Sequence, residues 1–139
     1  MQTVAEQPSA IRRYYEGLAE GVFRAIRCQA CGKHTFPPTG CCEHCGSWKV
    51  EPVELSGEGT LLFATHNIFP ACHPRFEKIA PYVYGHIRLK EGPIVQAIVL
   101  GVQATPADLG RLFERGPVPV TAEALPMDDL PVLAFRIHD

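Results

Sequence analysis

The sequence predicts a mainly β protein with an N-terminal helix, a cysteine-rich ribbon and a C-terminal five-stranded barrel of the OB type. Three observations predict this architecture. Apolar residues recur at helical spacing near the start of the chain. Five of the six cysteines then fall within residues 27–49, and segments rich in β-branched and aromatic residues fill the remainder. We expect the parts to divide at residues 1–21, 22–50 and 51–139.

The bulk composition limits the classes of function. A chain of 139 residues holds one modest domain with a small accessory unit. It has no apolar run approaching the roughly 20 residues that span a bilayer, and its start, MQTVAEQPSA, lacks the basic and apolar regions of a secretion signal. We therefore expect a cytoplasmic protein without a membrane partner. A formal charge of −2 makes a nucleic-acid partner unlikely as well.

The predicted helix begins near Pro8 or Ser9 and ends near Gly21. Its apolar residues follow spacings of three, four and seven: Ile11, Tyr14, Tyr15, Leu18 and Val22. A helix this short needs a surface to cover its apolar stripe. That surface belongs either to the chain's own domain or to another chain, and periodicity does not distinguish the two.

The predicted strands are bounded by glycine, proline or aspartate: 22–27, 48–55, 60–68, 82–89, 94–100, 118–125 and 130–137. Residues 56–59 break or bulge the first long strand, and residues 90–93 form a tight turn. Residues 105–113 read as a helix with a threonine N-cap and a proline at its first position. This order is that of an OB-fold, with a small sandwich as the alternative.

The cysteine cluster predicts a metal site. Cys28-x-x-Cys31 and Cys42-x-x-Cys45 are ten residues apart, and a glycine follows the second cysteine of each pair. Two residues between ligands let both sulfurs face one ion, and the glycine tolerates the tight turn that results. Four thiolates complete a closed tetrahedral site, which favours one structural Zn²⁺, with iron as the alternative. A closed site has no position for substrate, so we do not expect catalysis there.

The identity of one ligand is open from the sequence. Cys41 adjoins Cys42, and only Cys42 keeps the two-residue spacing to Cys45. His34 and His44 are nearby, but four cysteines already fill a zinc site.

Other chemistry is sparse. His66, Cys72 and His73 could form a Cys-His nucleophile or a second metal site, although a proline-braced loop is the simpler interpretation. We find no motif of a self-contained enzyme and expect no catalytic residue in this chain. Basic residues in the middle of the chain could contact the phosphates of CoA: Arg75, Lys78, Arg88 and Lys90.

The order of these motifs resembles a known family from about residue 14 to the C-terminus. The stretches that carry the resemblance are RCQACG (27–32), FPP (36–38), CEHCGS (42–47), ELSGEGT (54–60) and PYV (81–83). They are similar to the acyl-CoA-associated proteins once catalogued as domain of unknown function thirty-five. Two features depart from the family pattern, Glu43 where a proline is usual and the additional Cys41.

The resemblance implies an N-terminal helix, a rubredoxin-like zinc ribbon and an OB-fold. It also implies a small non-catalytic subunit that docks on a thiolase-like enzyme, in a complex that makes or cleaves carbon–carbon bonds of acyl-CoA thioesters. The ribbon and helix would hold the partner, and the OB domain would help to bind CoA or shape the acyl site. Two alternatives are a binder of single-stranded nucleic acid, with Phe63, Phe69, Tyr82 and Tyr84 as stacking platforms, and an iron-based electron-transfer module.

Overall fold

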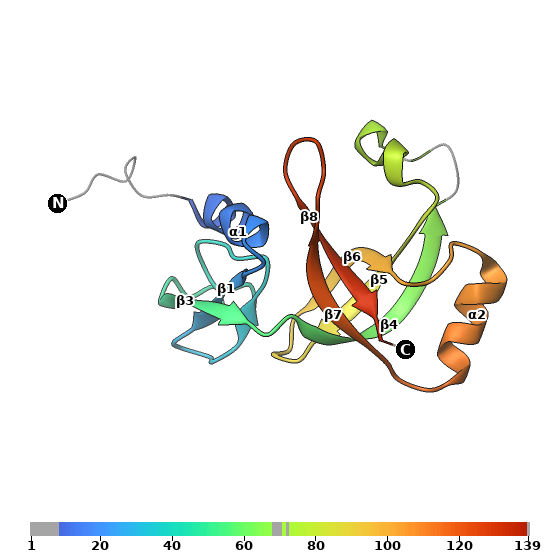
Figure 1. Ribbon diagram of the computed structural model, residues 1–139. Coiled ribbons are helices and arrows are strands. Elements are labelled where there is room, and N and C mark those ends of the chain that lie inside the picture. Colours follow the sequence, from blue (N-terminus) through green and yellow to red (C-terminus); the bar gives the residue numbers. More distant parts are fainter. Residues whose placement is uncertain (1–8, 68–70, 72, 139) are drawn as a thin grey trace. The chain divides into compact units, whose positions relative to one another are not determined.

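The computed structural model describes residues 9–67, 71 and 73–138. The chain forms two compact units (Figure 1). The first contains the chain up to Ser56 together with residues 91–93 and 124–132, and the second contains residues 57–90, 94–123 and 133–139. We refer to them as the ribbon unit and the barrel unit.

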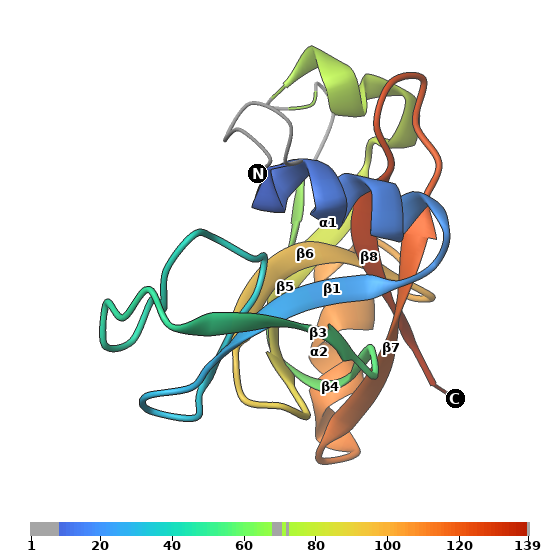
Figure 2. The same ribbon diagram turned by 90° about the vertical axis from the view of Figure 1, so that its left-hand side faces the viewer.

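The N-terminal helix α1 (Ala10–Ala19) begins where the sequence predicted. The Ser9 side chain accepts a hydrogen bond from the Arg12 N–H at 3.2 Å, which satisfies one of the free donors of the first turn. Tyr14 and Leu18 are buried, whereas Ile11 is 49% exposed. Strand β1 (Phe23–Cys28) packs against this helix (Figure 2). The ribbon unit therefore covers the middle of the apolar stripe, and its first residue faces solvent.

Three strands form the sheet of the ribbon unit, in the order β2-β1-β3. Strand β1 pairs antiparallel along its full length with β3 (Val50–Leu55), from Phe23 opposite Leu55 to Cys28 opposite Val50. The two-residue strand β2 (His34–Thr35) pairs with the other edge of β1 and was not predicted. Strand β3, expected in the barrel domain, thus hydrogen-bonds to the strand that leads into the cysteines.

The barrel unit closes through five strands in the order β4-β5-β6-β8-β7 (Figure 1). These strands are β4 (Glu58–Asn67), β5 (Tyr82–Leu89), β6 (Ile94–Leu100), β7 (Val118–Leu125) and β8 (Val132–Ile137). Most neighbours are antiparallel, and β6 and β8 run parallel. Closure and strand order confirm the predicted OB-fold, so the alternative sandwich is wrong.

The barrel interior is filled by side chains from every second position along its strands. Along β5 the odd positions Val83, Gly85, Ile87 and Leu89 are buried, and the even positions are half-buried or exposed. Phe135 and Ala134 on β8 are completely buried. Gly85 is required by packing, because a Cβ there would lie 2.1 Å from the Phe63 carbonyl oxygen. This close approach coincides with the bulge of β4 between Leu61 and Phe63.

Two short helices connect barrel strands. Helix α2 (Pro106–Glu114) follows the predicted signals, with the Thr105 side chain accepting from the Asp108 N–H at 3.1 Å. The second helix, η2 (Pro74–Ile79), is a 3₁₀ helix with His73 as its cap, where the sequence had indicated only a loop. Among residues 9–67, 71 and 73–138, no helix has the length and apolarity to cross a membrane.

Candidate metal centre and family

Two turns of the same hydrogen-bond pattern carry the four cysteines. In the first, the Cys28 N–H donates to the Lys33 carbonyl and the Gly32 N–H donates to the Cys28 carbonyl, both at 2.9 Å. In the second, Cys42 N–H donates to the Ser47 carbonyl at 2.9 Å and Gly46 N–H donates to Cys42 at 3.0 Å. Gly32 and Gly46 have φ angles of 76° and 78°, a conformation that favours glycine. The glycine after each pair therefore has the role that the sequence predicted.

These turns bring together the sulfur atoms of Cys28, Cys31, Cys42 and Cys45, which all lie within 4.8 Å of one another. The Sγ atoms of Cys28 and Cys45 are 3.6 Å apart, as are those of Cys31 and Cys42. A tetrahedral ion with Zn–S bonds of about 2.3 Å separates its sulfurs by about 3.8 Å. The donor set and its spacing therefore fit one tetrahedral zinc ion.

The surrounding backbone favours thiolates at two of the four positions. Hydrogen bonding from the Cys31 backbone N–H is the main cause that lowers the pKa of Cys28 to about 6. The backbone N–H of Cys45 similarly lowers the pKa of Cys42. At Cys45 the Ser47 N–H acts in the same direction, but the hydrogen bond with Cys28, then burial and the hydrogen bonds with Cys31 and Cys42, outweigh it and raise the pKa to about 11. A dication bound among the four sulfurs would favour the thiolate at each position.

The other candidate ligands lie outside this cluster. Cys41 contributes its carbonyl, which accepts a 2.6 Å hydrogen bond from the Thr39 hydroxyl, and its sulfur is not among the four. His44 Nε2 lies 2.9 Å from the His34 carbonyl oxygen, so this ring braces the two turns against each other. Glu43 donates its N–H to the buried Thr35 hydroxyl at 3.1 Å. The geometry thus selects Cys42 over Cys41.

The four basic residues expected to contact phosphate do not form one cluster. Arg75 and Lys78 belong to η2, which precedes the first residue of β5, whereas Arg88 and Lys90 lie at the end of that strand. The seven-residue step along β5 corresponds to roughly 23 Å. Lys90 also pairs with Glu58 at 3.2 Å. The two pairs of basic residues therefore lie at opposite ends of strand β5.

The remaining predicted groups are dispersed. Cys72 lies outside the described residues, so the structure does not place a Cys-His pair with His73. Phe69 lies outside them too. Tyr82 and Tyr84 have ring centroids 6.1 Å apart, while Phe63 faces His86 at 5.7 Å.

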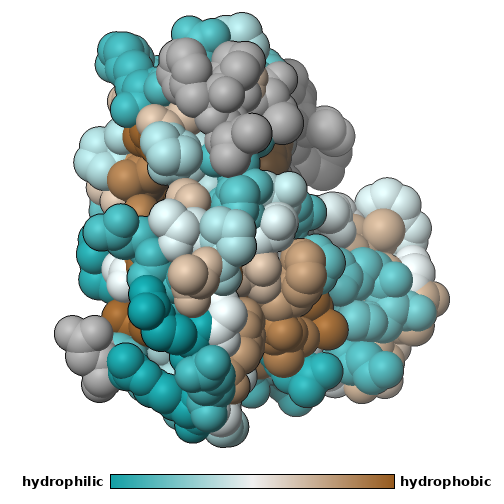
Figure 3. Space-filling view, turned by 90° about the vertical axis from the view of Figure 1, so that its right-hand side faces the viewer, coloured by the Kyte–Doolittle hydropathy of each residue, from teal (hydrophilic) through white to brown (hydrophobic). Residues whose placement is uncertain are grey.

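Hydrophobic side chains also reach the surface, as brown areas between hydrophilic ones in Figure 3 show. The most exposed large one is Trp48, at 78%, in the ribbon unit. The barrel unit contributes Leu62, Phe63, Ile94 and Phe113. A hollow beside α2, lined by Arg115, was not predicted, because it depends on how α2, β7 and β8 pack together.

Comparison with known proteins identifies the family. Residues 16–51 match the family model "ChsH2, rubredoxin-like zinc ribbon domain", and residues 52–115 match "ChsH2, C-terminal OB-fold domain". A DUF35 domain-containing scaffold protein from Pyrococcus furiosus is 31% identical over 99 residues, 70% of each chain. The chain belongs to the DUF35 family. The predicted zinc ribbon and OB-fold are thereby confirmed as family features.

Two further relatives match this DUF35 chain over part of their length. A DUF35 scaffold protein from Methanocaldococcus jannaschii is 33% identical over 90 residues, 64% of this chain and 62% of that protein. A probable enoyl-CoA hydratase alpha subunit from Thermomonospora curvata is 32% identical over 111 residues. These are 79% of this chain, but the chain spans only 32% of that relative.

Two solved structures share the DUF35 architecture. The structure described as "Ltp2-ChsH2(DUF35) aldolase" matches with a TM-score of 0.70 and 27% identity, over 97% of this chain and 98% of the other. A DUF35 protein of unknown function from Sulfolobus solfataricus matches with a TM-score of 0.57 over 93% and 85% of the two chains. Its 18% identity supports the fold alone.

Proposed function

We propose that this chain is a small zinc-binding subunit that docks on a thiolase-like enzyme, in a complex that makes or cleaves carbon–carbon bonds of acyl-CoA thioesters. The partner would supply the catalytic groups. This chain would stabilise the partner and help to shape its CoA or acyl site. The observation that carries the proposal is the likeness to the ChsH2 component of an aldolase, which extends over nearly all of both chains.

The scaffold relatives support a docking role, since the word scaffold describes a protein that holds others. In the proposed complex, catalysis belongs to the partner. Within it, Cys28, Cys31, Cys42 and Cys45 would hold one structural zinc ion. The ion would supply a rigid cross-link between the two turns and no reaction step, because four sulfurs close its coordination shell.

Trp48 is the side chain that we assign to the docking surface. It is 78% exposed beside the metal ribbon, and a Cβ on Gly40 would lie 3.4 Å from its ring. Tryptophan is enriched among the residues that dominate binding energy at interfaces, because it covers a large apolar area with few rotatable bonds. A rigid turn that carries an exposed tryptophan is well suited to insert it into a pocket of a partner.

Co-expression tests the docking role. We expect the zinc-loaded chain to co-purify with a thiolase-like protein encoded by the same genome and Trp48→Ala to weaken the complex at least tenfold. Phe63→Ala is the matched control, since Phe63 is an exposed aromatic residue (52%) of the barrel unit. If no thiolase-like protein of that genome co-purifies, the proposal is wrong. Salt-sensitive binding of single-stranded oligonucleotides would favour the nucleic-acid alternative instead.

We further propose that the barrel unit contributes to binding CoA. Arg88 and Lys90 at the end of β5 are the pair that we retain for its phosphates, because they line one surface hollow of about 450 Å³ with Thr60 and His138. Arg75 and Lys78 lie beyond the other end of that strand and would contact a different part of the ligand or none. Binding of CoA to the assembled complex, with Arg88→Ala and Arg75→Ala compared, separates these two pairs.

A further inference from the structure

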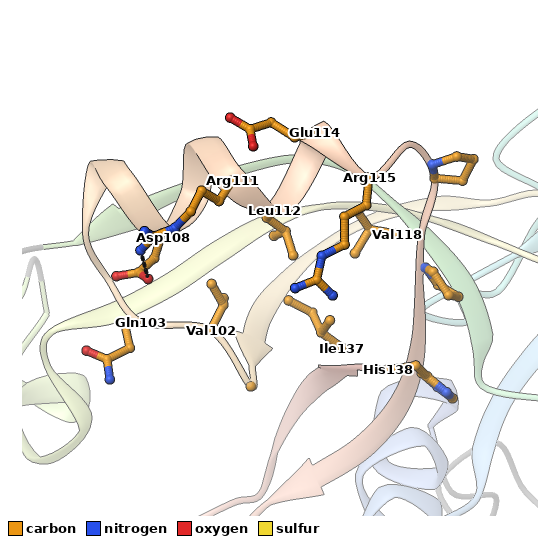
Figure 4. A pocket seen from close by; sticks show the side chains of 13 residues that line it. Val102, Gln103, Asp108, Arg111, Leu112, Glu114, Arg115, Val118, Ile137 and His138 are labelled. Carbon is orange, nitrogen blue, oxygen red and sulfur yellow. Dashed lines mark hydrogen bonds and ion pairs between the residues drawn. The ribbon is translucent and has the colours of Figure 1, made fainter.

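A second hollow of the barrel unit has features of a ligand site. It has a volume of about 680 Å³ and lies between α2, the segment before that helix and the end of β8 (Figure 4). Pockets for small molecules commonly measure 300–1,000 Å³ and combine apolar walls with a few polar groups. The sequence indicated helix and strands in this region but no candidate site residue.

The first feature is an arginine that has no ion-pair partner among the residues that the structure describes. Arg111 and Arg115 are four residues apart near the end of α2, and both line the hollow. Arg111 donates to Asp108 at 2.8 Å, and the hydrogen bond from the Thr105 hydroxyl, followed by this contact, lowers the pKa of Asp108. Among the described residues, no carboxylate pairs with Arg115. Figure 4 shows its guanidinium turned into the hollow and the adjacent Glu114 turned away.

The second feature is an apolar floor beside that cation. Val102, Leu112 and Ile137 are half-buried lining residues, and Val118 beneath them is 4% exposed. Solvent reaches these side chains, so a ligand that covers them gains the free energy of removing apolar surface from water. A guanidinium at the border of such a floor selects a ligand with one charged end and one apolar part.

We propose that this hollow binds a small oxyanion carried on an apolar stem. The planar guanidinium of Arg115 would hold the oxyanion through two parallel N–H donors, a geometry suited to carboxylate and phosphate. The stem would lie across Val102, Leu112 and Ile137. Two sources share this chemistry, the carboxylate of a short-chain organic acid and the phosphate of a phosphopantetheine group, which has an apolar gem-dimethyl carbon next to the methylene that carries the phosphate.

Titration of the full zinc-loaded chain with four probes tests the proposal: hexanoate, 4′-phosphopantetheine, CoA and inorganic phosphate. We expect at least one stem-bearing probe to bind and to shift the NMR resonances of α2 and β8. Arg115→Ala should weaken this binding at least tenfold, and Arg115→Lys less, since lysine keeps the charge but loses the fork. Hexanoate alone identifies a carboxylate ligand, and 4′-phosphopantetheine alone identifies the phosphate source.

Two matched variants complete the test. Val102→Thr keeps the side-chain shape and should weaken the stem-bearing probes but not inorganic phosphate. Arg12→Ala removes an exposed arginine of α1, in the other unit, and should change nothing. Absence of binding by every probe, or binding that Arg115→Ala leaves unchanged, overturns the proposal. Since the isolated chain is used, either result is independent of whether it docks on a partner.

Discussion

The two units of this chain are stabilised by different interactions. The barrel unit is closed by backbone pairing around a core of aliphatic side chains and Phe135. The ribbon unit has a three-stranded sheet with a two-residue edge strand, and two of its buried side chains, Cys28 and Cys42, are candidate metal ligands. The barrel therefore has an apolar core of its own, whereas the turns of the ribbon converge on four candidate metal ligands.

This difference determines where each unit is vulnerable. A metal ligand that is lost leaves three thiolates without a complete site, while the barrel strands keep all their partners. We expect the loss of a core side chain from the barrel to leave the sulfur geometry unchanged. The following substitutions test the contrast, from the largest expected effect to the smallest.

Replacing a ligand should unfold the ribbon turns. For Cys28→Ser or Cys45→Ser we expect loss of bound zinc and fast hydrogen exchange of the ribbon amides, since zinc binding contributes about 10–16 kcal/mol in isolated zinc fingers. Amide resonances of the barrel should persist. Cys41→Ser is the control, because its sulfur lies outside the cluster, and it should retain one zinc ion. Zinc loss in that variant would mean that the ligand set is wrong.

Removing the largest buried side chain of the barrel should destabilise the barrel and leave the zinc site intact. Phe135 is 0% exposed, so Phe135→Ala creates a cavity that costs about 3–5 kcal/mol of unfolding free energy. Urea unfolding followed by barrel amides measures this loss. Zinc content should not change. A simultaneous loss of zinc would show that the units fold as one, contrary to the comparison.

Alanine substitutions at two glycines of the barrel unit distinguish a glycine required by close packing from one that only adds backbone flexibility. Gly85→Ala would place a Cβ 2.1 Å from a backbone oxygen, so we expect destabilisation of at least about 1–3 kcal/mol. Gly110→Ala meets nothing within 4 Å on the exposed side of α2 and should stabilise by up to about 1 kcal/mol. Equal melting temperatures of the two variants would contradict the close strand approach.

The smallest effect concerns Tyr14 of the ribbon unit. Burial, and then the neighbouring Tyr15, raises its pKa from 10.0 to about 12. The folded state holds this proton more tightly, so the contribution to stability is complete below pH 10 and is lost as the pH rises toward 12. Urea unfolding followed by the methyl NMR resonances of the ribbon unit at pH 9 and 11 measures it. Tyr14→Phe, which keeps the ring contact with Phe36, should show a smaller decrease.

Most of the fold could be predicted because its signals are local. Strands β5, β6 and β7 have the predicted bounds, since turn residues such as those at 90–93 mark their ends. Helix α2 was visible from its Thr105 cap and Pro106. Strand β2 was missed because two residues carry no periodicity, and it exists only through pairing with β1. The separation of β3 from β4 at Gly57, whose φ is 81°, was foreseen as a break but not as a change of sheet.

The site was predictable to the same degree. The four cysteines were found because ligand spacing and the following glycines are encoded locally. The basic residues were grouped by sequence proximity, but β5 is extended and separates Arg75 from Arg88. Arg115 gave no signal, because its lack of a partner depends on the pairing of Arg111 with Asp108 and on the position of β8. Charge pairing in three dimensions decides which cations are free.

Metal analysis combined with chelation tests the central claim most directly. Native mass spectrometry of the purified full chain should show one zinc ion per chain. After removal of zinc by a chelator, amide exchange should become fast across Cys28–Cys45 and remain slow in β5, β6 and β8. A chain that contains no metal and yet protects the ribbon amides would contradict the account.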